Sequence, residues 1–172
     1  MSVARGDVSA PGTAGDEARA TVSVALSPAE AFRVFTEEIN LWWRRGRRFC
    51  NAPGERGIVC IEPGIGGRLF DSFDTEAGER VVVIGHTLAW EPPQRLLLER
   101  RNVNFGADER TEVEVLFRAS ANGTMVTVVH RDWSSIRADD PARHGLERPA
   151  FIRMMGMWWG DQLTALRLRA IR

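Results

Sequence analysis

Short stretches in which apolar and polar residues alternate fill most of the chain. In the clearest one, Val113, Val115 and Phe117 alternate with charged residues, which is the pattern of a β-strand with one buried and one solvated face. Turn-forming residues separate these stretches, and the connections are too short for a crossover helix, so we expect antiparallel neighbours. The predicted strands are 20–26, 57–62, 67–73, 80–90, 95–101, 111–119 and 124–133.

Two helical patterns accompany the strands. After the first strand, the segment 27–30 offers a capping Ser, a Pro at the first helical position and a Glu three residues after the cap, which is typical of a helix start. A longer pattern near the C-terminus predicts a second helix with Pro149 in its first turn. The apolar positions of that helix are Phe151, Met154, Met155, Trp158, Trp159, Leu163, Leu166 and Ile171.

This order of elements indicates an α+β fold. A sheet of about seven antiparallel strands has more apolar area on one face than a short helix covers, so we expect a curved sheet wrapped around the long C-terminal helix, with a short helical segment after the first strand. Such an architecture favours a hollow between the sheet and that helix. Residues 1–17 lack any apolar periodicity and are predicted to be a disordered leader, which leaves 18–172 as a single domain.

Six short motifs in this order resemble one known superfamily. The motif residues are Ser27, Pro28, Ala31 and Phe32; Trp42 and Trp43; Glu62, Pro63, Gly66, Gly67 and Arg68; Trp90, Pro92, Pro93, Arg95 and Leu96; Thr124, Val126, His130 and Trp133; and Trp159, Leu163 and Leu166. Together they resemble the helix-grip superfamily of START-like (SRPBCC) domains, in particular the branch similar to the C-terminal domain of the activator of heat-shock protein 90 ATPase. The resemblance covers residues 20–170 and implies a helix-grip fold. It does not fix one activity, because the superfamily includes ligand carriers, cyclases, hydroxylase subunits and chaperone activators.

Charge and hydropathy narrow the choice of partners. All 23 basic residues are Arg, and they balance 23 acidic residues, so the chain has no long-range field for nucleic acid or an anionic membrane. We read the cluster Arg44, Arg45, Arg47 and Arg48 as a solvated loop for this reason. No apolar run is long enough to cross a bilayer, and the first residues lack the apolar core of a secretory signal. We therefore expect a cytoplasmic protein with no nucleic-acid partner and no membrane insertion.

Residues on the inner face of the predicted sheet and on the last helix are the candidates for ligand binding. His130 shares a strand face with Val126 and Val128, which suits either a polar anchor in an apolar pocket or a buried His satisfied by its neighbours. His86 has the parity of Ile84 and would also face inward. The candidate ligand-binding residues are Phe35, Trp43, His86, Trp90, Phe117, Val128, His130, Met155 and Trp159.

The chain shows no motif for covalent, metal or cofactor chemistry. It has no Ser-His-Asp spacing, no Gly-rich phosphate loop and no HExxH pattern, so we assign no catalytic residue, no metal and no cofactor. Asp71 shares parity with the apolar Leu69 and is expected to pair with Arg68 or Arg100. We interpret the chain as a binding module for a small hydrophobic or amphipathic molecule.

Two alternatives stay open. One is a cyclase-like enzyme of the same fold that uses His130 as its acid or base. The other is a chaperone-partner protein that acts through its surface, as the resemblance to ATPase activators implies. A homodimer is also compatible with the sequence.

Overall fold

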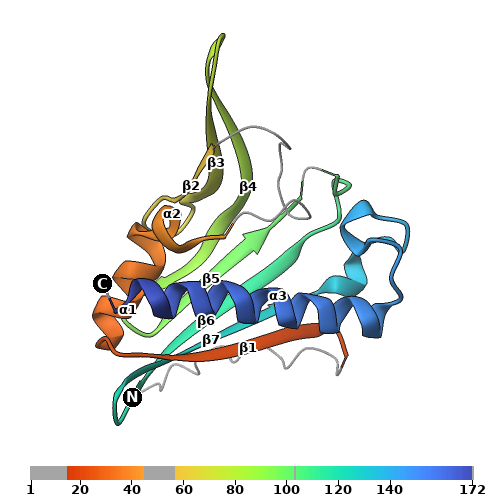
Figure 1. Ribbon diagram of the computed structural model, residues 1–172. Helices are drawn as coiled ribbons and strands as arrows, with labels where there is room; N and C mark the ends of the chain where they lie inside the picture. Colours follow the sequence, from red (N-terminus) through yellow and green to blue (C-terminus); the bar gives the residue numbers. More distant parts are fainter. Residues whose placement is uncertain (1–14, 45–56, 103, 172) are drawn as a thin grey trace, which may run out of the picture.

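The computed structural model describes residues 15–44, 57–102 and 104–171 (Figure 1). The strands and helices follow the order that the alternating patterns predict. They are β1 (Glu17–Val24), α1 (Pro28–Glu37), α2 (Ile39–Trp42), β2 (Gly57–Ile61), β3 (Arg68–Thr75), β4 (Gly78–Glu91), β5 (Arg95–Arg100), β6 (Thr111–Ser120), β7 (Gly123–Arg131) and α3 (Arg148–Arg169), with short 3-10 turns at Trp133–Ser135 and Pro141–Arg143 between β7 and α3.

The described strands form one antiparallel sheet that curves around α3, as predicted. Its order is β1-β7-β6-β5-β4-β3-β2, so the first strand pairs with the last one and the other strands pair with their neighbours in the chain. Figure 1 shows α3 lying along β1 and across the concave side of the sheet, while α1 and α2 cover the end near β2. None of the described helices is both long and apolar enough to span a membrane.

Helix α1 begins where the capping signal places it. The Ser27 hydroxyl accepts a hydrogen bond from the Glu30 backbone N–H at 3.3 Å, and the Glu30 carboxylate accepts one from the Ser27 N–H at 3.1 Å. These two bonds satisfy backbone donors that a helix start would otherwise leave open. The face that follows buries Phe32 and Phe35 against the sheet.

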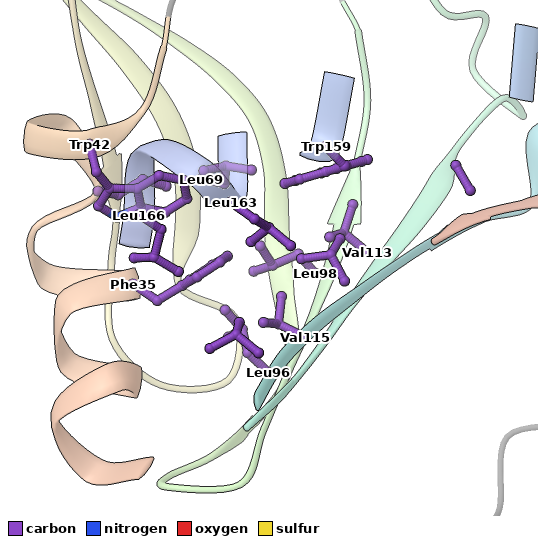
Figure 2. Close-up of a cluster of buried hydrophobic side chains, with 14 of the residues drawn as sticks. Phe35, Trp42, Leu69, Leu96, Leu98, Val113, Val115, Trp159, Leu163 and Leu166 are labelled. Carbon is purple, nitrogen blue, oxygen red and sulfur yellow. The ribbon is translucent and has the colours of Figure 1, made fainter. Parts of the chain in front are cut away.

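A single apolar core lies between the sheet and the helices. Leu96 and Val115 in the centre of the sheet have no exposed surface, and Leu163 and Leu166 of α3 are almost as fully buried. Figure 2 shows these side chains converging with Phe35. Each such side chain contributes about 1.5–3 kcal/mol to stability, so the core fixes the position of α3 over the sheet.

Strand β4 departs from the expected alternation. Its pairing with β3 is irregular between Leu69 and Phe70, and its pairing with β5 is irregular between Thr87 and Ala89. A bulge adds a residue on one strand and reverses which side chains face the core. Thr87 is therefore buried while His86 is exposed, and the expectation that His86 faces inward is wrong for this physical reason.

The N-terminal boundary of the described fold lies a few residues earlier than the predicted strand. Strand β1 begins at Glu17, and the Asp16 carboxylate accepts hydrogen bonds from the Ser134 backbone N–H at 2.6 Å and from the Ser134 hydroxyl at 2.8 Å. The leader prediction otherwise concerns residues 1–14, which lie outside the described residues. The same is true of Arg45, Arg47 and Arg48 in the predicted solvated loop.

Candidate functional site

His130 occupies the inner face of β7 with both of its ring nitrogens engaged. Its Nδ1 accepts the indole N–H of Trp159 on α3 at 3.1 Å, so the imidazole proton belongs on Nε2. Nε2 lies 2.8 Å from the Thr111 hydroxyl oxygen, and that hydroxyl donates to the backbone carbonyl of Arg100 at 3.0 Å. The three hydrogen bonds therefore form one directed chain from α3 through β7 and β6 to β5.

The surroundings of His130 keep its imidazole neutral. Only 1% of the residue is exposed, and burial, followed by the positive charge of Arg100, lowers the pKa of His130 well below its usual value. The Trp133 ring lies 4.2 Å from the imidazole, centre to centre, and the Phe151 ring packs edge-on against Trp133. A neutral ring with both nitrogens bonded has no free polar atom to offer a ligand.

Arg100 closes β5 on the same face of the strand as Leu96 and Leu98. Its guanidinium carbon lies 5.6 Å from the centre of the Trp43 ring and 5.4 Å from that of the Trp158 ring. Burial lowers the pKa of Arg100 to about 10, and the negative charge of Asp71 offsets only part of that effect. At neutral pH the group is still a cation, held by the faces of two indole rings.

No acceptor for the Arg100 guanidinium is found among the described residues, where it makes neither a hydrogen bond nor an ion pair. The expected partnership with Asp71 is thus an electrostatic influence on the cation. Arg68, the other candidate partner of Asp71, pairs with Glu62 at 2.6 Å. Arg100 is half-buried, so it has lost part of its hydration, and its N–H donors without a protein acceptor favour an acceptor from water or from a ligand.

Two small cavities meet at Arg100. The first, which we call the polar cavity, has a volume of about 30 Å³ and is lined by Arg100, Asn102, Thr111 and His130 together with aromatic rings. The second, the apolar cavity, has a volume of about 20 Å³ and combines Arg100 with aliphatic and aromatic side chains. These volumes hold roughly two waters and one water. A larger ligand would have to push side chains apart.

The structure brings together five of the nine candidate residues. Phe35, Trp43 and Trp159 line the apolar cavity, and His130 and Met155 line the polar cavity.

The other four candidates lie elsewhere. Trp90 and Phe117 both pack against Phe32 in the core, Val128 is fully buried in the sheet, and His86 is on the exposed face. Phe117 also borders an open groove of about 470 Å³ beside the β4–β5 turn.

Sequence reasoning missed Arg100 as a member of the site. It also omitted Thr111 and Asn102 of the polar cavity. Of the neighbouring residues Trp158 and Trp159, it assigned only Trp159 to the site. Arg100 has the strand parity of the buried Leu96 and Leu98, which is a readable signal for an inward-facing cation. Within the part of the chain that the structure describes, no group of three or more His, Cys, Asp or Glu side chains could hold a metal ion.

Comparison with known protein families gives a match over most of the chain. The family model described as "Activator of Hsp90 ATPase homolog 1-like protein" matches residues 25–166. No curated protein matches the chain significantly.

Solved structures agree with the fold at low sequence identity. Protein NE0264 from Nitrosomonas europaea is 15% identical over 93% of this chain and 97% of its own, with a TM-score of 0.60. Protein MLL2253 from Mesorhizobium loti is 16% identical over 88% of this chain and 94% of its own, with a TM-score of 0.59. The solution structure of the Aha1 dimer from Colwellia psychrerythraea is 14% identical over 88% of this chain and 92% of its own, with a TM-score of 0.57.

Proposed function

The chain belongs to the activator of Hsp90 ATPase homolog 1-like family, and from that premise we propose that it is a binding module for a small hydrophobic or amphipathic ligand. The ligand lies between the curved sheet and α3. The observation that carries this proposal is the pair of cavities that meet at Arg100 beneath α3. One cavity is apolar and the other has polar groups, which together suit an amphipathic molecule.

The lining of the cavities supports a site that can adapt to its ligand. Met155 and Trp158 of α3 line the polar cavity, and Trp43 and Trp159 line the apolar one. Met side chains fill irregular spaces and change rotamer at little cost. Widening of the cavities therefore requires movement of these few side chains on α3 and directly after α2, while the strands of the sheet stay in place.

The state of His130 favours binding over catalysis. An acid or base needs a nitrogen within reach of the substrate and a pKa near the working pH. Both nitrogens of His130 are bonded to protein groups, and burial lowers its pKa. A cyclase-like role would have to break the directed chain of hydrogen bonds before any proton could move.

The small volume of both cavities favours a second candidate function. A protein that contacts a chaperone through its surface needs no internal cavity, and typical ligand pockets of about 300–1,000 Å³ are much larger than these two. The family name describes activators of the Hsp90 ATPase. A surface contact with a chaperone is therefore the alternative that the binding experiments have to separate from the first proposal.

Native mass spectrometry of the purified protein, combined with titration of the neutral dye Nile red, tests the ligand proposal. We expect a co-purifying small molecule that is lost on denaturation, or a saturable rise in dye fluorescence. The variant Met155→Ala should bind the dye more tightly because it enlarges the polar cavity, whereas Met157→Ala, on the exposed side of the same helix, should not. If no small molecule co-purifies and the dye binds neither the wild type nor the Met155→Ala variant, the chaperone-contact function is the better account.

A further inference from the structure

Arg100 borders two chemically different cavities beneath α3. One is the polar cavity with Asn102 and Thr111. The other is the apolar cavity, whose walls include Ile84 and Leu98. A molecule that occupied both cavities would place its apolar part beside Leu98 and its polar part at the guanidinium.

The indole rings that hold Arg100 leave its hydrogen-bonding capacity open. Trp43 and Trp158 meet edge to face, with ring centres 5.5 Å apart, and both lie against the guanidinium. Contacts with ring faces stabilise the positive charge but accept no conventional N–H hydrogen bonds, and an Arg has five N–H donors in a planar fork. A carboxylate is the group whose two oxygens match that fork.

The charged groups around the site favour a headgroup with one negative charge over one with two. His130 is neutral, so it adds no second cation to Arg100. The negative charge of Asp71 already acts on the guanidinium and would repel a doubly charged group such as a phosphate monoester more strongly than a carboxylate. The polar cavity is also small, about 30 Å³, which suits a compact headgroup.

We propose that the ligand is an amphipathic monocarboxylate whose carboxylate binds the guanidinium of Arg100 between Trp43 and Trp158. Its hydrocarbon part enters the apolar cavity. This inference rests on the proposed ligand-binding function and specifies the chemical class of the ligand. Asn102, on the wall of the polar cavity, is placed to supply an additional amide donor to the headgroup.

The experiment compares decanoate with decan-1-ol, which has the same chain and no charge, by titration calorimetry at neutral pH. The wild type should bind decanoate at least about tenfold more tightly than decanol. The variant Arg100→Gln should lose roughly 10- to 100-fold in decanoate affinity, as expected for a hydrogen bond to a charged group, while its decanol affinity stays within about threefold of the wild type. The variant Arg118→Gln, which makes the same charge change at an exposed position of β6, should leave both affinities unchanged.

The controls separate the two levels of the proposal. Retained decanol binding shows that Arg100→Gln is folded. If that variant does not fold, Arg100→Lys replaces it in the decanoate titration, because Lys keeps the charge but lacks the planar fork. Equal affinities of the wild type for the two compounds, or an unchanged decanoate affinity in both Arg100 variants, would overturn the carboxylate inference alone. Failure of the wild type to bind either compound would overturn the proposed ligand-binding function, and the inference with it.

Discussion

The indole N–H of Trp159 on α3 donates a hydrogen bond to Nδ1 of His130 on β7 at 3.1 Å. This bond joins the helix to the sheet through polar groups in an otherwise apolar core. It also sets the tautomer of the imidazole, because the nitrogen that accepts cannot carry the proton. The remaining N–H of His130 therefore points to Thr111.

Replacing Trp159 by Phe should lower the free energy of unfolding by about 2–4 kcal/mol, since the smaller phenyl ring leaves part of the buried indole volume empty and His130 Nδ1 loses its donor. Denaturant unfolding measures the change. In a His130→Phe background the same replacement should cost less, because the acceptor is already gone, and this coupling is the quantity that a double-mutant cycle isolates. Strict additivity of the two substitutions would show that the hydrogen bond contributes nothing.

Stability should fall as the pH drops from about 8 to about 5.5, because the pKa of His130 is lower in the folded protein than in the unfolded chain. The unfolded chain then binds more protons below about pH 6.5, so the stability that is present above this pH is lost as the pH falls further. For one proton the slope approaches about 1.4 kcal/mol per pH unit. Urea unfolding at a series of pH values measures it, and His130→Gln should flatten the profile.

Met155→Ala should enlarge the polar cavity and lower the free energy of unfolding by about 2–5 kcal/mol, as is usual when a buried Met is truncated. Met155 is buried and lines the cavity, whereas Met157 on the same helix is 73% exposed. Met157→Ala should change stability by less than about 0.5 kcal/mol. Thermal and denaturant unfolding of both variants checks this, and similar losses in the two would mean that α3 presents a different face to the sheet.

Two glycines should respond to Ala in opposite directions. A Cβ on Gly85 would overlap the backbone carbonyl oxygen of Glu99 on the neighbouring strand, so Gly85→Ala should destabilise the fold by more than about 3 kcal/mol. Gly160 lies within α3, and a Cβ there meets no atom of the described residues within 4 Å. Gly160→Ala should therefore stabilise the protein by about 0.5–1 kcal/mol. The melting temperatures of the two variants give the comparison.

Asp16→Ala should lower the free energy of unfolding by about 1–3 kcal/mol, because the carboxylate that accepts two hydrogen bonds from Ser134 is removed. Deletion of residues 1–14 leaves Asp16 and β1 in place, and we expect an unchanged melting temperature. Calorimetric melting of the two proteins is the measurement. A large loss of stability on deletion of 1–14 together with a neutral Asp16→Ala would reverse this assignment.

Local patterns were sufficient to predict the fold but not the faces of every strand. In β6, the alternation of Val113, Val115 and Phe117 with charged residues matches the observed burial, because that strand pairs regularly and one of its faces is turned to solvent. In β4 the same reasoning failed at His86, because the bulges arise from the register of β4 with both of its neighbours. Pairing register is a property of two strands and is not visible in the sequence of one.

The candidate site was predictable only in part for a related reason. Strand parity placed His130 inside, but its partners Trp159 and Thr111 come from other elements, so the sequence left its role as anchor or satisfied core residue undecided. The sequence suggests Arg100 only as a partner for Asp71, because a charged residue at the end of a strand usually reaches water and gives no sign of a second role. Its neighbours Trp43 and Trp158 come from opposite ends of the chain, and only the folded arrangement brings them together.

The pairing of β1 with β7 also sets an order for folding. Strands β2 to β7 are joined by short connections and can pair one after another as the chain is made, whereas the partner of β1 is the last of the described strands to be synthesised. Thr21 and Thr127, whose hydroxyl oxygens lie 3.0 Å apart across these two strands, are 106 residues apart in the sequence. Closing so long a loop makes folding slower than local pairing does. During synthesis on the ribosome, the backbone N–H and C=O groups of β1 therefore have no partner strand until β7 has emerged.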